Sequence, residues 1–334
     1  MTAPIRNRAT MRPPARLPQI VSSKVPEPHV LILLAVRNGA RHLAAQLDSI
    51  AAQEHRRWSL LVSDDGSDDE SRQILADFAR CGHDVTVLEG PCLGPAENFM
   101  SLFRRAAPFL TPGSFIATCD QDDVWFPSRL RFGVERLQGI AADHPAMVFH
   151  KTLITDEALQ NPRPSAPRPR KPGFRNALVQ NIAAGNTILL NAGASALICS
   201  AAVEPDCVVM HDWWSYLIVT GVGGTALQDD RPVLFYRQHG RNEVGANDGL
   251  RARLRRVSMV YAGTFRAWND INLQALTRSA HRLTPEHRAT LALFAAARRG
   301  GLGARFAALW RARLYRQSGF STLALWVAAG FRRL

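Results

Sequence analysis

The segment HVLILLAV, residues 29–36, is a continuous apolar run of the kind found in a strand buried on both faces of a parallel sheet. Leu43, Leu47 and Ile50 follow at helical spacing and predict a helix over residues 40–53. The alternation continues with predicted strands over residues 58–62, 84–88 and 114–119 and a helix over residues 95–106. This order predicts an α/β fold with a doubly wound, mostly parallel sheet, whose ligands bind at the carboxyl ends of the strands.

Two acidic turns stand at predicted strand ends. SFIATCDQDDVW, residues 114–125, places Asp120, Asp122 and Asp123 directly after an apolar strand, and Asp64-Asp65-Gly66-Ser67 follows another. Clustered carboxylates repel one another, so they favour a site where a hard cation and a phosphate neutralise them, and Asp120 and Asp122 alternate so that both can reach one ion. We expect both turns to share one cleft. The alternative is that the acids only favour the positive end of a following helix.

Two further turn sequences predict where a helix starts and how phosphate is bound. Ser67 and Glu70 have the spacing of a capping box, which predicts that a helix begins after the first acidic turn. The turn after the first strand, residues 36–40, contains a single Gly, whereas a dinucleotide-binding turn requires G-x-G-x-x-G, and the chain has no Walker A pattern. Phosphate is therefore expected to be bound by a metal ion and side chains.

Basic residues are concentrated at the two ends of the chain. The net charge is +13, residues 251–334 contain 16 Arg and 2 acids, and residues 1–28 contain 5 basic residues and 1 acid. The middle is thus acidic on balance, which disfavours nucleic acid as a partner and favours an anionic membrane surface. The 5 cysteines lack CxxC spacing, which disfavours disulfides and zinc and fits a reducing cytoplasm.

We divide the chain into a disordered basic arm (1–28), a catalytic domain (29–250) and a basic helical region (251–334). The arm lacks the apolar core of a signal peptide, and no apolar run reaches the ~18 residues of a spanning helix. The proline-rich segment 161–173 predicts a mobile loop. We expect a cytoplasmic protein, peripheral at the inner face of the cell membrane.

The C-terminal region contains an amphipathic pattern over residues 302–316. Its apolar face is formed by Leu302, Phe306, Leu309, Trp310 and Leu314, with Arg305, Arg311 and Arg316 at the margins. A short apolar run, residues 323–331, follows. Such a pattern suits the membrane interface, and the alternative is that these helices pack on the catalytic domain.

A series of motifs occurs in order along residues 29–250. They are Asn38-Gly39, Ser63 to Ser67, Gly94 to Phe99, Asp120 to Trp125, Asn181 to Thr187, His211 to Trp214 and Tyr236 to Gly240. Together they resemble glycosyltransferase family 2, and the later ones resemble its rhamnosyltransferase-like subgroup. The resemblance implies a nucleotide-diphospho-sugar transferase fold of the GT-A type with a C-terminal helical appendage, and an inverting, metal-dependent sugar transfer.

The resemblance also implies roles for individual residues. Asp212 corresponds to the general base, and Asp120 and Asp122 to the ligands of Mg²⁺ or Mn²⁺. The donor nucleotide is expected at Ala35, Arg37, Asn38, Asp65, Asn98 and Asp120, the diphosphate at Arg237 and His239, and the acceptor at Gly185, Asn186, His211 and Trp213. The chemistry fits, because a cation stabilises a leaving diphosphate and an acceptor hydroxyl needs a carboxylate base.

Several of these residues have simpler interpretations. Asp212 precedes an apolar helix and could be its cap, and Trp213 could be a core residue. The chain also departs from the family pattern, since Arg37 stands where the family usually has Tyr and Asp68 where it has Thr. A planar cation at position 37 could replace stacking on the base, which bears on the identity of the nucleotide.

We expect the donor to be a nucleotide diphosphate sugar such as dTDP-rhamnose, and the acceptor to be lipid-linked or a growing surface polysaccharide. Two other functions compete. A sugar-phosphate nucleotidyltransferase also uses metal carboxylates but would favour a Gly-rich, basic first loop. A basic nucleic-acid-binding protein would explain the net charge but not the central acidic motifs.

Overall fold

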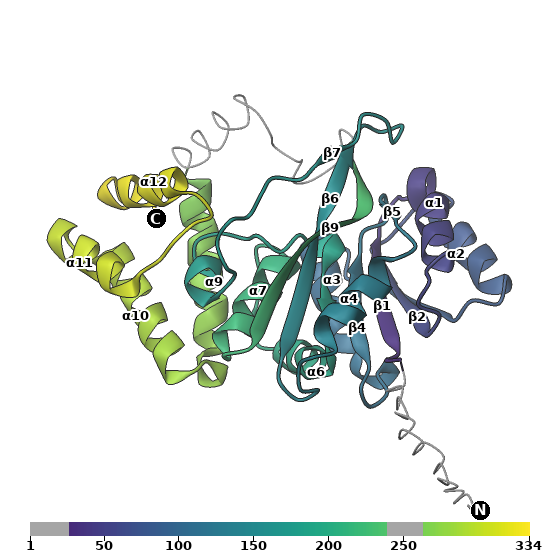
Figure 1. Ribbon diagram of the computed structural model, residues 1–334, viewed down its shortest axis with the longest axis horizontal. Coiled ribbons are helices and arrows are strands. Elements are labelled where there is room, and N and C mark those ends of the chain that lie inside the picture. Colours follow the sequence, from purple (N-terminus) through teal and green to yellow (C-terminus); the bar gives the residue numbers. More distant parts are fainter. Residues whose placement is uncertain (1–26, 239–262) are drawn as a thin grey trace, which may run out of the picture.

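A single mixed sheet lies at the centre of the computed structural model, which describes residues 27–238 and 263–334 (Figure 1). Its strands run in the order β3-β2-β1-β4-β8-β6-β9-β5, with β7 paired to β6. They are β1 (Val30–Val36), β2 (Trp58–Asp64), β3 (Val85–Glu89), β4 (Phe115–Cys119), β5 (Val124–Trp125), β6 (Ala146–Thr155), β7 (Arg163–Pro164), β8 (Leu189–Leu190) and β9 (Thr225–Arg237). Both chain segments that carry the acidic turns thus belong to one sheet.

The first four strands in sequence form the parallel half of the sheet. β1 pairs in parallel with β2 on one side and β4 on the other, and β3 extends β2. The register places Val36 beside Asp64 and Leu34 beside Cys119, so the chain leaves all three central strands at one edge. The predicted mostly parallel sheet is confirmed, with β8, β5 and β7 as its antiparallel members.

Helices cover both faces of the sheet. Leu31 and Leu33 of β1 belong to one hydrophobic cluster, and Ile32 and Leu34 belong to the other, so the apolar run is buried on both sides as expected. One cluster includes side chains of α1 (Ala40–Ala51), α2 (Ser71–Arg80) and α4 (Arg129–Leu137). The other includes side chains of α3 (Pro95–Arg105), α5 (Phe174–Ala177), α6 (Ala192–Ala201) and α7 (His211–Gly221).

The predicted capping box before α2 is wrong. The helix begins at Ser71, and Glu70 in the N-cap position makes no side-chain cap bond. The Ser67 hydroxyl instead donates to the Asp64 carboxylate, and Asp69 Oδ1 accepts from the Ser71 backbone N–H at 3.0 Å. The start of the helix explains the difference, because Glu70 stands at the N-cap where a capping box requires Ser67, and the Ser67 oxygen accepts from the Asn38 N–H at 2.9 Å instead.

The C-terminal helices pack against the catalytic part of the chain. They are α9 (Thr264–Arg278), α10 (Pro285–Arg299), α11 (Leu302–Ala312) and α12 (Gly319–Gly330). Leu276, Leu283 and Phe294 belong to the same cluster as Trp214 of α7. None of the helices within 27–238 and 263–334 has the length and apolar content needed to cross a bilayer. The arm 1–28 lies almost wholly, and the boundary at residue 250 entirely, outside the described residues.

The amphipathic face predicted for residues 302–316 is divided between the protein and the solvent. α11 ends at Ala312, because Arg313 adopts a left-handed backbone conformation with φ 50°, and Leu309 and Leu314 are buried. Arg305, expected at a solvent margin, is 2% exposed and donates to the carbonyl oxygens of Ala297 and Ala329 at 2.9 and 2.6 Å. Arg305 is therefore a packing residue, and the predicted apolar residues separate into Leu309 and Leu314, which are buried, and Leu302 and Trp310, which are exposed.

The loop 161–173 is also tied down. The Arg170 N–H donates to Gln317 Oε1 at 2.9 Å, Gln317 Nε2 donates back to the Arg170 carbonyl at 3.1 Å, and the Tyr315 hydroxyl donates to the Lys171 carbonyl at 2.7 Å. The polar backbone groups near the end of the predicted mobile loop are thus bound by the segment that joins α11 to α12.

Candidate active site

The loops that follow β1, β2 and β4 meet at one edge of the sheet. Gln121, which lies between the acidic residues after β4, pairs with both backbone groups of Arg37, accepting from its N–H at 2.8 Å and donating to its carbonyl at 3.1 Å. The Arg37 guanidinium lies 4.0 Å from the Asp65 carboxylate after β2. The two acidic turns therefore both contact the loop that follows β1.

Gln121 was missed as a site residue. It alternates with Asp120 and Asp122 in an extended turn, so its side chain points away from theirs, and this spacing could have identified it. Gly39 allows the contact, because a Cβ there would lie 2.5 Å from Gln121 Oε1. The amide thus fixes the acidic turn against the end of β1.

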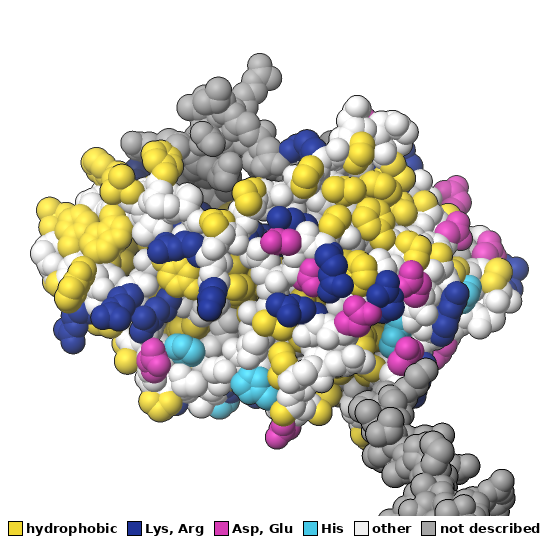
Figure 2. All heavy atoms as spheres, viewed as in Figure 1, with side chains coloured by type: hydrophobic (Ala, Val, Ile, Leu, Met, Phe, Trp, Pro, Cys, Tyr) yellow, Lys and Arg dark blue, Asp and Glu magenta, His cyan; other side chains and the backbone are white. Residues whose placement is uncertain are grey.

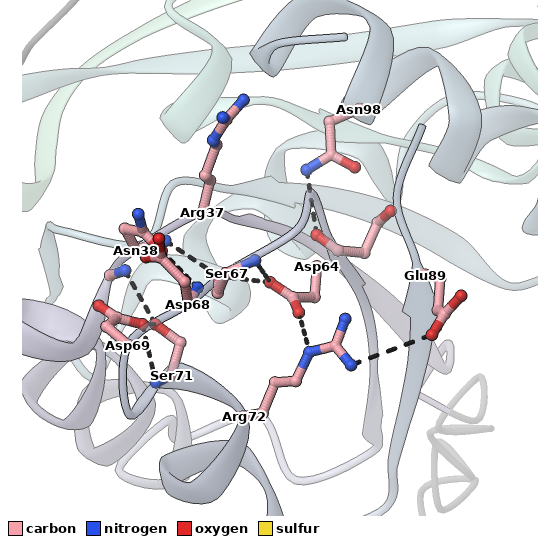
Figure 3. Close-up of polar contacts among 12 residues, drawn as sticks. Arg37, Asn38, Asp64, Ser67, Asp68, Asp69, Ser71, Arg72, Glu89 and Asn98 are labelled. Carbon is pink, nitrogen blue, oxygen red and sulfur yellow. Dashed lines mark hydrogen bonds and ion pairs between the residues drawn. The ribbon is translucent and has the colours of Figure 1, made fainter. Parts of the chain in front are cut away.

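The amino terminus of α1 is already occupied by side chains (Figure 3). Ser67 accepts from the Asn38 N–H at 2.9 Å, Ser71 from the Gly39 N–H at 2.9 Å, and Asp69 from the Ala40 N–H at 3.0 Å. Helix N-termini are common phosphate sites because their N–H groups are unsatisfied. Here these N–H groups have side-chain partners, which agrees with the absence of the glycine signature. A phosphate would therefore have to be bound by other groups.

The first acidic turn is mainly a scaffold. Asp64 accepts from the Ser67 N–H at 3.1 Å and binds the Arg72 side chain (Figure 3). Asp65, 1% exposed, accepts from the backbone N–H groups of Cys92 and Gly94 at 2.6 and 3.0 Å. Its carboxylate therefore holds the β3–α3 loop against β2, and the Arg37 guanidinium stands beside it, 58% exposed.

Two further residues expected to bind the nucleotide lie at this edge. Ala35 is 9% exposed in β1, opposite Ser63 of β2. Asn98 is in α3, and its Nδ2 donates to the Ser63 carbonyl at 3.0 Å (Figure 3). Asn98 Oδ1 is buried without a hydrogen-bond partner in the part of the chain that the structure describes. That oxygen could accept a hydrogen bond from a ligand.

The carboxylates of the second acidic turn differ in burial. Asp120 and Asp122 are half-buried, whereas Asp123 is fully buried and accepts from Asn186 Nδ2 at 2.6 Å. Burial, followed by the nearby charges of Asp122 and Asp120, raises the pKa of Asp123 well above its usual range. The alternative role as helix acids is excluded for this turn, since α4 begins only at Arg129. Asp123 is a structural residue, which leaves Asp120 and Asp122 at the edge of the sheet.

A buried arginine supports the same turn. Arg129 is 3% exposed, lies over the Trp125 ring at 3.3 Å, and donates to the carbonyl oxygens of Thr118 and Asn186 at 2.8 and 2.6 Å. Burial lowers its pKa to about 9. Together with Asp123 and Asn186 it forms a packed polar cluster under the turn, and nothing in the sequence pattern separates these residues from exposed ones.

A single 3₁₀ turn, Gly185–Thr187, connects the acidic turn to Asp212. The Gly185 N–H donates to Asp212 Oδ2 at 3.1 Å, its carbonyl accepts from the Thr118 hydroxyl, and Asn186 binds Asp123. A Cβ on Gly185 would lie 2.7 Å from His211 Nε2, so no other residue fits without a shift. Gly185 and Asn186, expected near the acceptor, are buried connectors in this structure.

Asp212 lies in the first turn of α7 and is half-buried. The N-cap is Met210, so the interpretation of Asp212 as the N-cap is wrong, although its Oδ1 does accept from the Trp213 N–H at 2.6 Å. Burial raises its pKa to about 6, against the lowering effect of hydrogen bonds from Asn181, Trp213 and Gly185. A carboxylate with this pKa is a suitable proton acceptor near neutral pH.

The neighbours of Asp212 pack in the core. His211 is stacked on Phe99 with ring centroids 3.7 Å apart, and burial lowers its pKa to about 3, which keeps the ring neutral. Trp213 is 2% exposed, and its indole N–H donates to the Ala177 carbonyl at 2.7 Å. Trp213 therefore offers no ring face to a sugar and takes the core role instead of the expected platform.

The diphosphate residues lie at the end of β9. Arg237 is 6% exposed and its Nε donates to the Asp122 carbonyl at 3.0 Å, while its other end binds the Glu157 carbonyl. It is thus placed to hold the acidic turn. His239 lies outside the described residues. Among 27–238 and 263–334, no three His, Cys, Asp or Glu side chains are grouped as a metal site.

The sequence comparison identifies the family. Residues 31–196 match the model of Glycosyl transferase family 2, a span that runs from β1 to α6 and includes both acidic turns. The chain belongs to this family. Asp212 lies beyond the matched residues, so its assignment depends on the contacts described above.

Curated relatives of this glycosyltransferase agree with the family. It is 25% identical over 242 residues to dTDP-rhamnosyl transferase RfbG of Shigella flexneri, an alignment that covers 68% of this chain and 78% of the relative. It is 27% identical over 108 residues to UDP-Glc:alpha-D-GlcNAc-diphosphoundecaprenol beta-1,3-glucosyltransferase WfgD of Escherichia coli, covering 32% of this chain and 40% of the relative.

Solved structures confirm the GT-A fold of this family 2 glycosyltransferase. S. aureus TarS 1-349 superposes with a TM-score of 0.51 at 12% identity, covering 85% of this chain and 72% of that one. The same protein in complex with UDP-GlcNAc gives a TM-score of 0.50 at 14% identity, covering 85% and 80%. At this identity the likeness concerns the fold alone.

Proposed function

We propose that this enzyme transfers a sugar, rhamnose, from a nucleotide diphosphate donor to a lipid-linked or surface-polysaccharide acceptor, with inversion at the anomeric carbon. The observation that carries the proposal is the turn at Gly185 and Asn186, whose consecutive residues bind Asp212 and Asp123. This turn connects a proton acceptor to the acidic turn that carries Asp120 and Asp122.

The donor set of the acidic turn fits Mg²⁺ or Mn²⁺. Mg²⁺ is usually bound by one or two carboxylates together with substrate phosphates, and Asp120 and Asp122 supply two carboxylates while Asp123 is withdrawn into the core. The bound cation would neutralise charge on the leaving diphosphate. Arg237 and Gln121 hold the turn that carries these ligands.

The remaining site residues have complementary roles. Asp212 removes the proton of the acceptor hydroxyl while that oxygen bonds to the anomeric carbon and the bond to the diphosphate oxygen breaks, so the nucleoside diphosphate leaves with the electron pair. Arg37, beside Asp65 and largely exposed, contacts the nucleotide, and Asn98 Oδ1 accepts a hydrogen bond from it.

Two relatives support the finer assignments. The Shigella protein is named for dTDP-rhamnose, which supports rhamnose as the sugar, and the Escherichia coli protein is named for a diphosphoundecaprenol acceptor, which supports a lipid-linked acceptor. A nucleotidyltransferase is disfavoured because the N–H groups at the start of α1 are occupied.

Thermal stabilisation by a panel of nucleotide sugars tests the donor. We expect dTDP-rhamnose with Mn²⁺ to raise the melting temperature more than UDP- or GDP-sugars do, because a ligand stabilises the native state by binding only to it. The matched control is the same panel with EDTA, where the shift should vanish. Equal shifts with and without metal would contradict metal-dependent binding, and a preference for another donor would replace rhamnose.

The pH dependence of turnover tests the base. Because Asp212 must be ionised to accept a proton and burial raises its pKa to about 6, we expect kcat/KM to increase with pH through about 6 and to level off above it. At one unit below the pKa, about a tenth of the plateau rate should remain. The measurement is kcat/KM between pH 5 and 8, and a flat profile would contradict the assignment.

A further inference from the structure

Helix α12 is apolar on the side that faces solvent as well as on the side that faces the protein. Phe320, Leu323 and Val327 are 78%, 61% and 50% exposed, and they recur at helical spacing, with Phe331 continuing the row at 69%. The opposite side, which includes Leu325 and Ala329, is buried. The sequence has no charged residue between Gln317 and Gly330. A helix that is apolar all round is normally covered.

Helix α11 extends the same surface. Trp310 is 74% and Leu302 60% exposed. Phe306 of α11 stacks on Trp326 of α12, with ring centroids 5.9 Å apart and planes 4° from parallel, so the two helices are joined by their aromatic side chains. Figure 2 shows apolar side chains over α11 and α12 at the left of the view. We name this surface, formed by Leu302, Trp310, Phe320, Leu323, Val327 and Phe331, the apolar docking face.

Arginines border the apolar docking face. Arg311 and Arg313 at the end of α11, and Arg332 and Arg333 after α12, are exposed. Figure 2 shows Lys and Arg side chains directly below and beside the apolar ones.

A groove of about 810 Å³ between α9, α10 and the chain end continues this basic surface. Its charged lining residues are Arg266, Arg278, Arg298, Arg299, Arg332 and the buried Arg305, opposed by Asp270, which pairs with Arg298 at 2.8 Å. The positive charge therefore lies next to the apolar surface.

We propose that the apolar docking face binds an anionic lipid bilayer, with α12 and Trp310 lying in the interface and the arginines on lipid headgroups. Exposed aromatic and aliphatic side chains bordered by arginine are the composition of interfacial helices, which insert about 5–10 Å. A second copy of the chain fits less well, because a symmetric contact would bring two arginine borders together. In Figure 1 α12 lies on the upper side of the molecule, toward which the carboxyl ends of β1 and β6 also point, so a membrane-borne acceptor would be near the site.

Flotation with vesicles tests the proposal. We expect the full-length protein to float with phosphatidylcholine vesicles that contain phosphatidylglycerol and much less with phosphatidylcholine alone. The triple variant Phe320→Ser, Leu323→Ser, Val327→Ser should lose at least about tenfold in binding, since each removes apolar contact with the bilayer. Arg332→Gln with Arg333→Gln should lose about fivefold per arginine on the anionic vesicles. Val203→Ser, which removes a 68% exposed apolar side chain elsewhere, is the matched control and should bind as wild type.

A second measurement does not depend on the triple variant remaining folded. Brominated lipid should quench tryptophan fluorescence of the wild type, and Trp310→Phe should lose part of that quenching while keeping its flotation. Binding of the folded triple variant at the wild-type level, or absence of quenching, would overturn the proposal. A dimer that the triple variant dissociates, without vesicle binding, would also overturn it and assign the face to a second copy. The assays need no donor or acceptor, so their outcome is separate from the proposed sugar transfer.

Discussion

Asp212→Asn is expected to lower the rate of sugar transfer by about 10²- to 10⁴-fold, the usual contribution of a general base, while leaving donor binding in place. The amide keeps the size of the side chain but cannot take up the acceptor proton. The measurement is kcat for transfer, with donor affinity determined separately by thermal stabilisation. A kcat near the wild-type value would show that another group is the base.

The hydrogen bonds of Asp212 require a control for stability in that experiment. Asp212 accepts from the backbone N–H groups of Trp213 and Gly185 and from the Asn181 side chain, whereas an asparagine has one acceptor oxygen. At least one donor therefore loses its partner, which costs about 1–3 kcal/mol of folding free energy. An unchanged donor-induced shift on a modestly lowered melting temperature is the expected pattern. Loss of donor binding as well would point to a structural role for Asp212.

Asp122→Asn is expected to abolish the metal-dependent part of donor binding and to lower kcat/KM by about 10²- to 10³-fold, because a cation supplies several kcal/mol to a leaving diphosphate. The Asp122 carbonyl that Arg237 binds is a backbone group and survives the substitution. The fold of the turn should therefore persist. The measurements are Mn²⁺ titration of donor binding and steady-state kinetics.

Asp143→Asn provides the matched control, since it makes the same chemical change at an exposed position before β6. Asp123→Asn is the informative neighbour. Asp123 is fully buried and bound to Asn186, so its loss should lower stability and leave metal dependence intact. If Asp122→Asn retained the metal response and Asp123→Asn lost it, the roles within the acidic turn would be reversed.

The sequence located the elements that position the site. An apolar strand buried on both faces and acids directly after two parallel strands together predicted the sheet and the edge at which the acidic turns lie. These predictions succeed because strand periodicity and turn chemistry are local properties of the chain. The capping box at Ser67 failed because the helix begins only at Ser71 and the Ser67 oxygen accepts from the Asn38 N–H, a partner from another loop.

What each acid or aromatic residue does was decided only by tertiary structure. Asp120, Asp122 and Asp123 are alike in sequence, yet only Asp123 is fully buried, where it accepts from Asn186, a residue distant in the chain. Packing against Ala177 likewise places Trp213 in the core.

Burial in the C-terminal helices was likewise decided by tertiary structure. Helical periodicity predicts an apolar and a polar side for α11, but which side is covered depends on α10 and α12. Arg305 is buried because its guanidinium donates to carbonyl oxygens of these two helices. The sequence by itself determined the sheet, the acidic edge and a basic tail. Long-range contacts determined which side chains remain available to a ligand or a membrane, because burial depends on what packs against a residue and not on its neighbours in the chain.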